Sequence, residues 1–267
     1  MTSRSYLAAG LLVAEILLFP RFASPTDPNV PADLNAVLSR ASTRIAKLLD
    51  QLSNMKCTEL VEQEKLRSDG KVELKEQSTY DYLVILTNNG GELNLNESRM
   101  AVGQVNADRK NTAMLLSNGF ATLFLVFHPY YADSFRFRIT GQLTSEGHDL
   151  VKVSFEHIPE TRSPAALALR GRDYPLELSG EAWIDPQTGV ITRMEAGVGD
   201  SLHDVGLKSL QSEVEFAPAP LRGVPETYWF PIVATVEVET PRQHWRNTHR
   251  FTEYKLFSVS TEDHVAP

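Results

Sequence analysis

The chain has 267 residues, of which 42% are hydrophobic and 22% charged, so it carries enough apolar material for a sizeable core. Its formal net charge of -8 argues against a nucleic-acid-binding protein, which needs a basic patch, and against attraction to an anionic membrane surface. Length alone is compatible with one large domain or with two small ones.

The N-terminal residues have the pattern of an export signal. Arg4 provides a short positive region, residues 7–19 form an apolar run, and small side chains at Ala23 and Ser24 offer a cleavage point. The run is shorter than the about 20 residues that a transmembrane helix needs. We therefore expect an exported, periplasmic protein. The alternative is an uncleaved N-terminal segment that tethers the chain to the inner membrane.

An amphipathic helix is predicted next. Asp33 is a suitable N-cap for it. The apolar residues that follow recur at helical spacing along one side: Leu34, Val37, Leu38, Ala41, Ile45, Leu48, Leu49 and Leu52. Because a single helix gains little stability from propensity alone, this side must pack on another part of the protein.

From Cys57 onward the hydrophobic period changes to two, which is typical of strands. Residues 58–67 and 71–86 flank a turn at 68–70 and predict a hairpin. Cys57 is the only cysteine, so no internal disulfide can form, and its expected role is a small buried side chain. The apolar stretch 112–127 interrupts the strands and predicts a buried helix.

The second half of the chain alternates apolar and polar side chains. The clearest segments are 135–140, 151–156, 190–195, 210–216 and 232–239. Such alternation indicates antiparallel strands with one face packed and one face in water. Strands of this number and length usually curl to hide their edges. We predict an α+β, mainly β fold: one strongly curved antiparallel sheet, a half-barrel, with helices packed on its concave face.

The pattern divides the chain into four parts. These are an export signal segment at 1–24, a linker at 25–32, a single curved-sheet domain at 33–258 and a C-terminal tail at 259–267. No change of composition within the third part argues for a second domain. The oligomeric state does not follow from the sequence.

The sequence lacks zinc-ligand motifs, phosphate loops, dinucleotide fingerprints and nucleophile elbows. Three pairs of glutamates stand two residues apart on predicted strands: Glu62 and Glu64, Glu213 and Glu215, and Glu237 and Glu239. Each pair opposes an apolar face, which is typical of a solvated surface rather than of catalytic carboxylates. His244 and His249 are five residues apart on one strand and so point to opposite faces.

We therefore expect a protein that is not an enzyme, with no catalytic residue, no cofactor and no metal. Replacement of Glu213, Glu237 or His249 by alanine should leave function largely intact, because we interpret all three side chains as exposed.

Residues 180–194, Gly-Glu-Ala-Trp-Ile-Asp-Pro-Gln-Thr-Gly-Val-Ile-Thr-Arg-Met, predict a hairpin. Asp185 can bond the turn backbone, Pro186 presets φ, and Gly189 suits the left-handed position. This phrase resembles the hairpin of periplasmic proteins with the lipoprotein-carrier fold, which are LolA-, LolB- and RseB-like. The order of the elements over roughly 33–258 fits the same resemblance. The chain departs from LolB-like proteins because it has no lipid-attached cysteine.

The resemblance implies a curved sheet that cups helices around a hollow for acyl chains. It implies a non-catalytic periplasmic binding module for a lipid, a lipoprotein acyl chain or another apolar ligand, with no nucleic acid among its partners. Candidate lining residues are Phe135, Phe137, Val153, Phe155, Met194, Phe216 and Val236. The same residues could equally fill a solid core. The alternative function is an envelope protein-interaction or sensor module without a ligand cavity.

Overall fold

The computed structural model describes residues 32–89, 92–103, 121–145, 148–169, 172–198, 206–221 and 227–256. The chain divides after Pro31. The predicted export segment, the linker up to Pro31 and the tail at 259–267 lie outside the described residues. These boundaries stay predictions, as does a single domain over 33–258.

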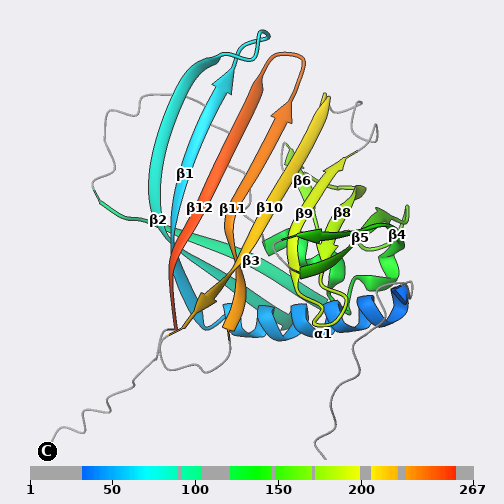
Figure 1. Ribbon diagram of the computed structural model, residues 1–267. Coiled ribbons are helices and arrows are strands. Elements are labelled where there is room, and N and C mark those ends of the chain that lie inside the picture. The colour runs from blue at the N-terminus through cyan, green and yellow to red at the C-terminus, as the bar shows by residue number, and fades with distance from the viewer. Residues whose placement is uncertain are drawn as a thin grey trace, which may run out of the picture. The chain divides into compact units, whose positions relative to one another are not determined.

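Ten strands form one antiparallel sheet in the order β3-β2-β1-β12-β11-β10-β9-β8-β5-β4 (Figure 1). They are β1 (Met55–Leu66), β2 (Val72–Asn89), β3 (Glu92–Ala101), β4 (Phe135–Ser145), β5 (His148–His157), β8 (Leu178–Ile184), β9 (Ile191–Val198), β10 (Ser209–Pro220), β11 (Thr227–Glu239) and β12 (His244–Leu256). Two further strands, β6 (Ala166–Leu169) and β7 (Arg172–Pro175), pair with each other. The described helices are α1 (Leu34–Leu52), α2 (Ala121–Phe124) and two 3₁₀ turns, η1 (Leu125–Phe127) and η2 (Ala132–Ser134).

The prediction of a mainly β protein with one large antiparallel sheet is confirmed. The prediction of a strongly curved half-barrel is wrong, because the sheet is open, with β3 and β4 as its edges, and is not strongly curled. The physical reason lies in the edge strands. β4 exposes Arg136 and Arg138, and exposed charges protect an edge from pairing with another chain without closure of the sheet.

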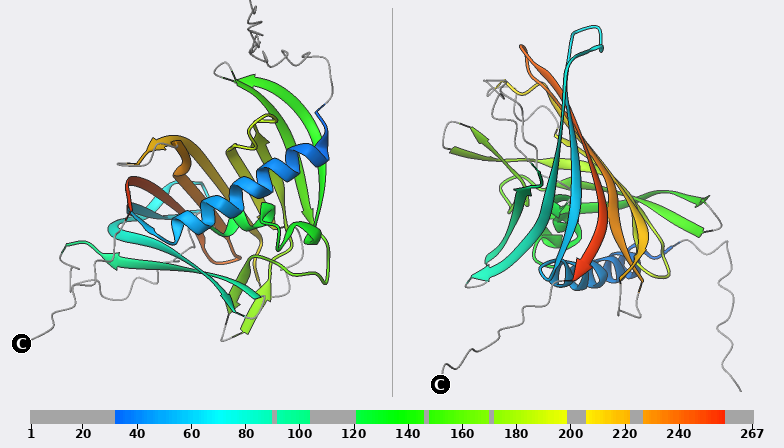
Figure 2. Two further views of the ribbon diagram at one scale, coloured as in Figure 1. Left: turned by 90° about the horizontal axis from the view of Figure 1, so that it is seen from below. Right: turned by 90° about the vertical axis from the view of Figure 1, so that its left-hand side faces the viewer.

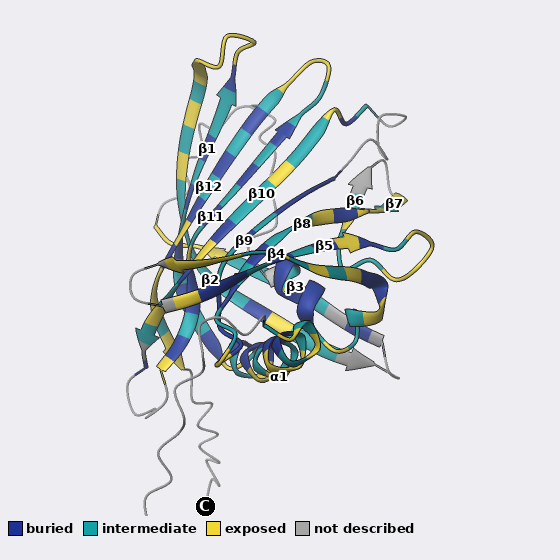
Figure 3. Ribbon diagram, turned by 45° about the vertical axis from the view of Figure 1, so that its right-hand side comes forward, coloured by how far each residue is buried: buried dark blue, intermediate teal, exposed yellow. Residues whose placement is uncertain are grey.

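The long strands bury one face, as the alternating pattern predicts (Figure 3). One row of paired positions on this face is buried from β1 to β5: Val61, His249, Ala234, Val214, Met194, Ala182 and Val153. The opposite face is polar and carries ion pairs. Lys75 bonds Glu62 at 2.6 Å, Arg193 bonds Glu213 at 2.7 Å, and the shortest contact of Arg246 with Glu237 is 3.0 Å. The paired glutamates therefore lie on the surface that the sequence indicated.

The predicted amphipathic helix is α1. The Oδ1 atom of Asp33 accepts a hydrogen bond from the backbone N–H of Asn35 at 3.0 Å, which caps the helix as expected. The buried side of α1 consists of Val37, Ala41, Ile45, Leu48, Leu49 and Leu52, and it belongs to the same hydrophobic cluster as the buried face of the sheet. The helix runs across the strands and contacts β1, β2 and β4 (Figure 2).

The hairpin between β8 and β9 has the predicted turn, and it contacts α1. Oδ1 of Asp185 accepts from the N–H groups of Gln187 and Thr188 at 2.8 and 3.1 Å. Gly189 has a φ of +72°, and a Cβ at this position would lie 2.5 Å from the carbonyl carbon of Arg40. Nη1 of Arg40 donates to the carbonyl oxygen of Pro186 at 2.9 Å. The turn therefore fixes the first half of α1 as well as reversing the chain.

The helix predicted over 112–127 can be compared with the structure only in part. Residues 121–127 form α2 and η1 and are followed by an extended residue, His128, just before Pro129. Side chains 123–127 are buried, as predicted. Residues 112–120 lie outside the described residues.

Candidate ligand site between α1 and the sheet

The structure brings the predicted lining residues into one hydrophobic cluster. Phe135 and Phe137 lie on β4, Val153 and Phe155 on β5, Met194 on β9, Phe216 on β10 and Val236 on β11. All are buried except Phe137, which is half-buried. Whether any of them touches a ligand stays a prediction.

Aromatic side chains of α2 and η1 pack over several of these residues. The ring of Phe127 lies 5.3 Å from that of Phe137 and 6.0 Å from that of Phe155, centroid to centroid. The ring of Phe124 lies 4.8 Å from that of Phe216. One side of each of these three candidates is therefore covered by the chain itself.

Two candidates have other surroundings. Met194 is fully buried in the cross-strand row, where it is paired with Ala182 and Val214. Val236 is paired with Asn247 on one side and Ser212 on the other, so its row is partly polar. The candidates therefore differ in their immediate surroundings within one hydrophobic cluster.

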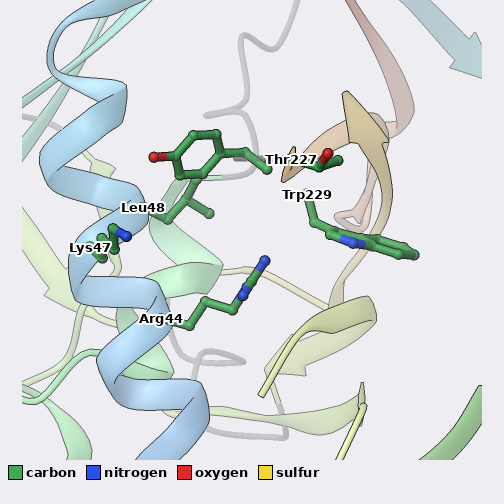
Figure 4. A pocket seen from close by; sticks show the side chains of 6 residues that line it. Arg44, Lys47, Leu48, Thr227 and Trp229 are labelled. Carbon is green, nitrogen blue, oxygen red and sulfur yellow. The ribbon is translucent and has the colours of Figure 1, made fainter. Parts of the chain in front are cut away.

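A pocket of about 260 Å³ opens between α1 and the start of β11 (Figure 4). Its lining residues are Arg44, Lys47, Leu48, Thr227, Tyr228 and Trp229. Leu48 and Tyr228 are buried members of the hydrophobic cluster, so the floor of the pocket is part of the core. In Figure 4 the side chain of Arg44 extends from α1 toward β11, and Trp229 lies on the opposite side.

A two-stranded extension of the sheet carries the β11 side of this pocket. Trp229 pairs with Pro218 of β10, whereas β9 pairs with β10 no further than Glu215. Pro218 is compatible with this position because no third strand needs a hydrogen bond from its nitrogen there. The rings of Phe230 and Tyr254 stack at 4.3 Å, and the hydroxyl of Tyr254 donates to the carbonyl of Pro231 at 2.8 Å. These contacts hold the extension against β12.

The buried face of β1 carries a charged side chain, Glu59. Glu59 is fully buried and accepts from Nε of Arg99 at 2.6 Å, and its Oε1 lies 2.8 Å from Nδ1 of His249. Arg99 also bonds Glu97 at 3.2 Å and lies over the ring of Tyr82 at 5.1 Å. Burial opposes ionisation of Glu59, but the hydrogen bonds from His249 and Arg99 outweigh it and lower the pKa of Glu59.

The interpretation of His249 as an exposed residue is wrong, because its side chain is fully buried and bonded to Glu59. The prediction that His244 faces the other way is correct, since Nε2 of His244 bonds Glu237 on the polar face.

Cys57 is buried as predicted, and burial raises its pKa to about 12, so it is a thiol and not a nucleophile at neutral pH. Within the described ranges no three His, Cys, Asp or Glu side chains come together as a metal site.

The sequence pattern did not identify the pocket residues. Arg44 and Lys47 lie outside the apolar stripe that predicted the helix, and Trp229 lies in none of the alternating segments that predicted strands. One signal was available, because Arg40, Arg44 and Lys47 recur at helical spacing in an acidic chain. A second signal was Glu59, which lies in phase with the apolar residues Cys57 and Val61.

No protein-family model matches the chain, and no curated protein sequence does. Among solved structures, a DUF1329 family protein from Desulfovibrio piger is 12% identical, with a TM-score of 0.45, over 87% of this chain and 96% of its own. A LolA superfamily protein from Nitrosomonas europaea is 11% identical, with a TM-score of 0.38, over 88% of this chain and 100% of its own. A domain from Vibrio parahaemolyticus assigned to outer membrane lipoprotein sorting is 10% identical, with a TM-score of 0.37, over 85% and 94%.

Two of these three structures bear the names of lipoprotein-carrier proteins, the class whose hairpin residues 180–194 resemble. In the described part of the chain, no helix is both long and apolar enough to span a bilayer.

Proposed function

We propose that this chain is a non-catalytic periplasmic binding module for a lipid or another amphiphilic molecule, which enters at the pocket between α1 and β11. The observation that carries the proposal is the pocket itself, because its floor is formed by core side chains, Leu48 and Tyr228, while its mouth is open to solvent. Small-molecule sites are usually concave and mostly apolar, with a few polar groups that orient the ligand.

The size of the pocket suggests how much of a ligand it can take. Its volume of about 260 Å³ is slightly below the roughly 300–1,000 Å³ of typical ligand sites, so it fits a head and the first part of a chain. A longer chain needs space deeper in the core. We propose that α1 and the segment 121–127 cover the packed face of the sheet, and that the rings of Phe124 and Phe127 give way to an acyl chain.

This arrangement assigns a role to the candidate lining residues. Phe137, Phe155 and Phe216 contact the rings that would move, so they would line the site only in its open form. The resemblance of the hairpin at 180–194 to that of lipoprotein-carrier proteins supports the same class of ligand.

Native mass spectrometry of the protein purified from its own envelope tests the proposal. We expect a bound lipid mass, and displacement of a fluorescent fatty acid by that lipid. Thr227→Trp should block the mouth of the pocket and weaken probe binding, because Thr227 is an exposed lining residue. Thr252→Trp places the same side chain at an exposed position of β12 outside the pocket and serves as the matched control. No lipid mass and no probe binding by the parent chain would refute the proposal.

One observation favours the alternative function, an envelope protein-interaction or sensor module. The edge strand β4 exposes Arg136 and Arg138, and both residues line a surface pocket of about 280 Å³. The other lining residues of this pocket are Phe137, Ser154, Phe155, Glu156, Ser179 and Gly180. An acidic segment of another protein could form ion pairs with these two arginines without adding a strand to the edge that they protect. Cross-linking in the envelope would test this alternative, because Arg136→Glu with Arg138→Glu should abolish a protein cross-link and leave probe binding unchanged.

A further inference from the structure

Helix α1 concentrates positive charge along one side of an acidic protein. Arg40, Arg44 and Lys47 are four and three residues apart, so they are neighbours on the helix surface, while the whole chain has a formal net charge of -8. Arg40 donates to the carbonyl of Pro186, whereas Arg44 and Lys47 line the pocket. Among the described residues that line this pocket there is no carboxylate. The described lining residues therefore carry positive charge in a protein that is acidic as a whole.

The exposure of the lining residues varies with their chemistry. Lys47 and Thr227 are exposed and Arg44 is half-buried, whereas Leu48 and Tyr228 are buried. Cationic groups thus lie toward the mouth, and apolar groups form the floor. A ligand that matches this gradient has a negative end in contact with solvent and an apolar end directed into the core.

Building on the proposed function, we infer that the pocket selects anionic amphiphiles: a carboxylate or phosphate head pairs with Arg44 and Lys47, and the adjoining chain lies on Leu48 and Tyr228. A guanidinium suits this role because its planar donors bond two oxygens of a carboxylate or phosphate at once. Lys47 adds a compact charge on a flexible stem that follows heads of different size. The half-buried indole of Trp229 closes the side of the pocket opposite Arg44.

The test compares binding of dodecanoate, dodecyl phosphate, dodecanol and inorganic phosphate to the purified full chain by titration calorimetry, with the two anionic amphiphiles below their micelle concentrations and dodecanol below its solubility limit. We expect the two anionic amphiphiles to bind about tenfold more tightly than dodecanol, which corresponds to about 1.4 kcal/mol. Added salt should reduce this preference. The double variant Arg44→Gln with Lys47→Gln should lose it and bind all three amphiphiles alike.

Arg40→Gln is the control, because it removes one positive charge from the same helix outside the pocket, and it should keep the preference. Melting curves verify that each variant is folded. Equal binding of dodecanoate and dodecanol to the parent would overturn the inference and leave the proposed function standing. Phosphate that binds as tightly as dodecyl phosphate would also overturn it, since the site would then recognise a free anion. Binding of none of the four would refute the proposed function together with the inference.

A preference that survives the double variant would place the anionic head elsewhere and overturn the assignment to Arg44 and Lys47. These substitutions are informative because changes at surface positions usually alter stability by no more than about 0.5 kcal/mol. A change in affinity therefore reports on the site rather than on folding.

Discussion

Phe127→Ala distinguishes a solid core from a ligand site that the chain itself fills. The side chain of Phe127 is 2% exposed, and its ring lies 5.3 Å from that of Phe137 and 6.0 Å from that of Phe155. Truncation of a buried phenylalanine costs about 3–5 kcal/mol of unfolding free energy, because contacts are lost and a cavity remains. We expect a loss in this range in denaturant melts without ligand.

The ligand-dependent part of the experiment is decisive. If an acyl chain takes the place of the Phe127 ring, the variant has a preformed cavity and should bind a fluorescent fatty acid more tightly than the parent. Saturation at about 100 times the dissociation constant would then restore about 2.7 kcal/mol of the lost stability. Denaturant melts with and without dodecanoate measure both quantities on the same protein.

Phe230→Ala is the control for general loosening of the core. Phe230 is also fully buried, but its ring stacks on that of Tyr254 and lies tilted against that of Tyr228, whereas Phe127 packs on Phe137 and Phe155. Its truncation should cost similar stability without any gain in probe affinity. If Phe127→Ala loses stability and gains no affinity either, the segment 121–127 does not occupy a ligand site, and our reasoning on its displacement is refuted.

Three further outcomes are expected. Gly189→Ala should lose more stability in thermal melts than Gly70→Ala, although both residues have a positive φ. The reason is that a Cβ at Gly189 would meet the backbone of α1, whereas a Cβ at Gly70 would meet nothing within 4 Å. Equal losses, each within the about 1–3 kcal/mol of backbone strain, would contradict this contact. Glu59→Gln should cost about 3–5 kcal/mol at neutral pH, because Arg99 keeps Glu97 as a partner but loses the charge of the fully buried Glu59. The pKa of Glu59 is lowered in the folded protein, so its carboxylate stabilises the fold above the unfolded pKa of about 4.3 and loses this effect as the pH falls through the folded pKa. The unfolding free energy of the variant should therefore decrease less steeply with falling pH than that of the parent. N-terminal sequencing of the mature protein should find a start close to Ala23 or Ser24, and a soluble cytoplasmic chain that begins at Met1 would exclude export.

Much of the fold follows from local patterns that the sequence shows directly. Asp33 followed by an apolar stripe predicted α1, and the alternation over 232–239 predicted most of β11, because each depends on residues close in the chain. The curvature of the sheet was predicted wrongly because it depends on how the edges are protected. Arg136 and Arg138 perform that role at β4, and no periodicity shows which strand will be an edge.

The candidate site could be predicted only in part, for a physical reason. Apolar side chains on a strand look the same whether they face a ligand or another part of the core. Phe155 was expected to line a hollow, but only the structure shows that Phe127 packs on it. The pocket lies where α1 meets the start of β11, and these elements are far apart in the chain. Such a meeting point leaves no local signal.

The Glu59–Arg99 pair places an ionic group on a buried face that is mostly apolar. A buried ion pair is weak evidence for stability, because the loss of hydration can exceed the electrostatic gain. Its geometry, however, depends on register. Arg99 of β3 is paired with Tyr82 of β2 and reaches past it to Glu59 of β1. A shift of β3 by one residue would turn Arg99 to the opposite face and leave Glu59 without it. Because β3 is an edge strand with β2 as its one neighbour in the sheet, this contact fixes a register that the strand ladder alone specifies weakly.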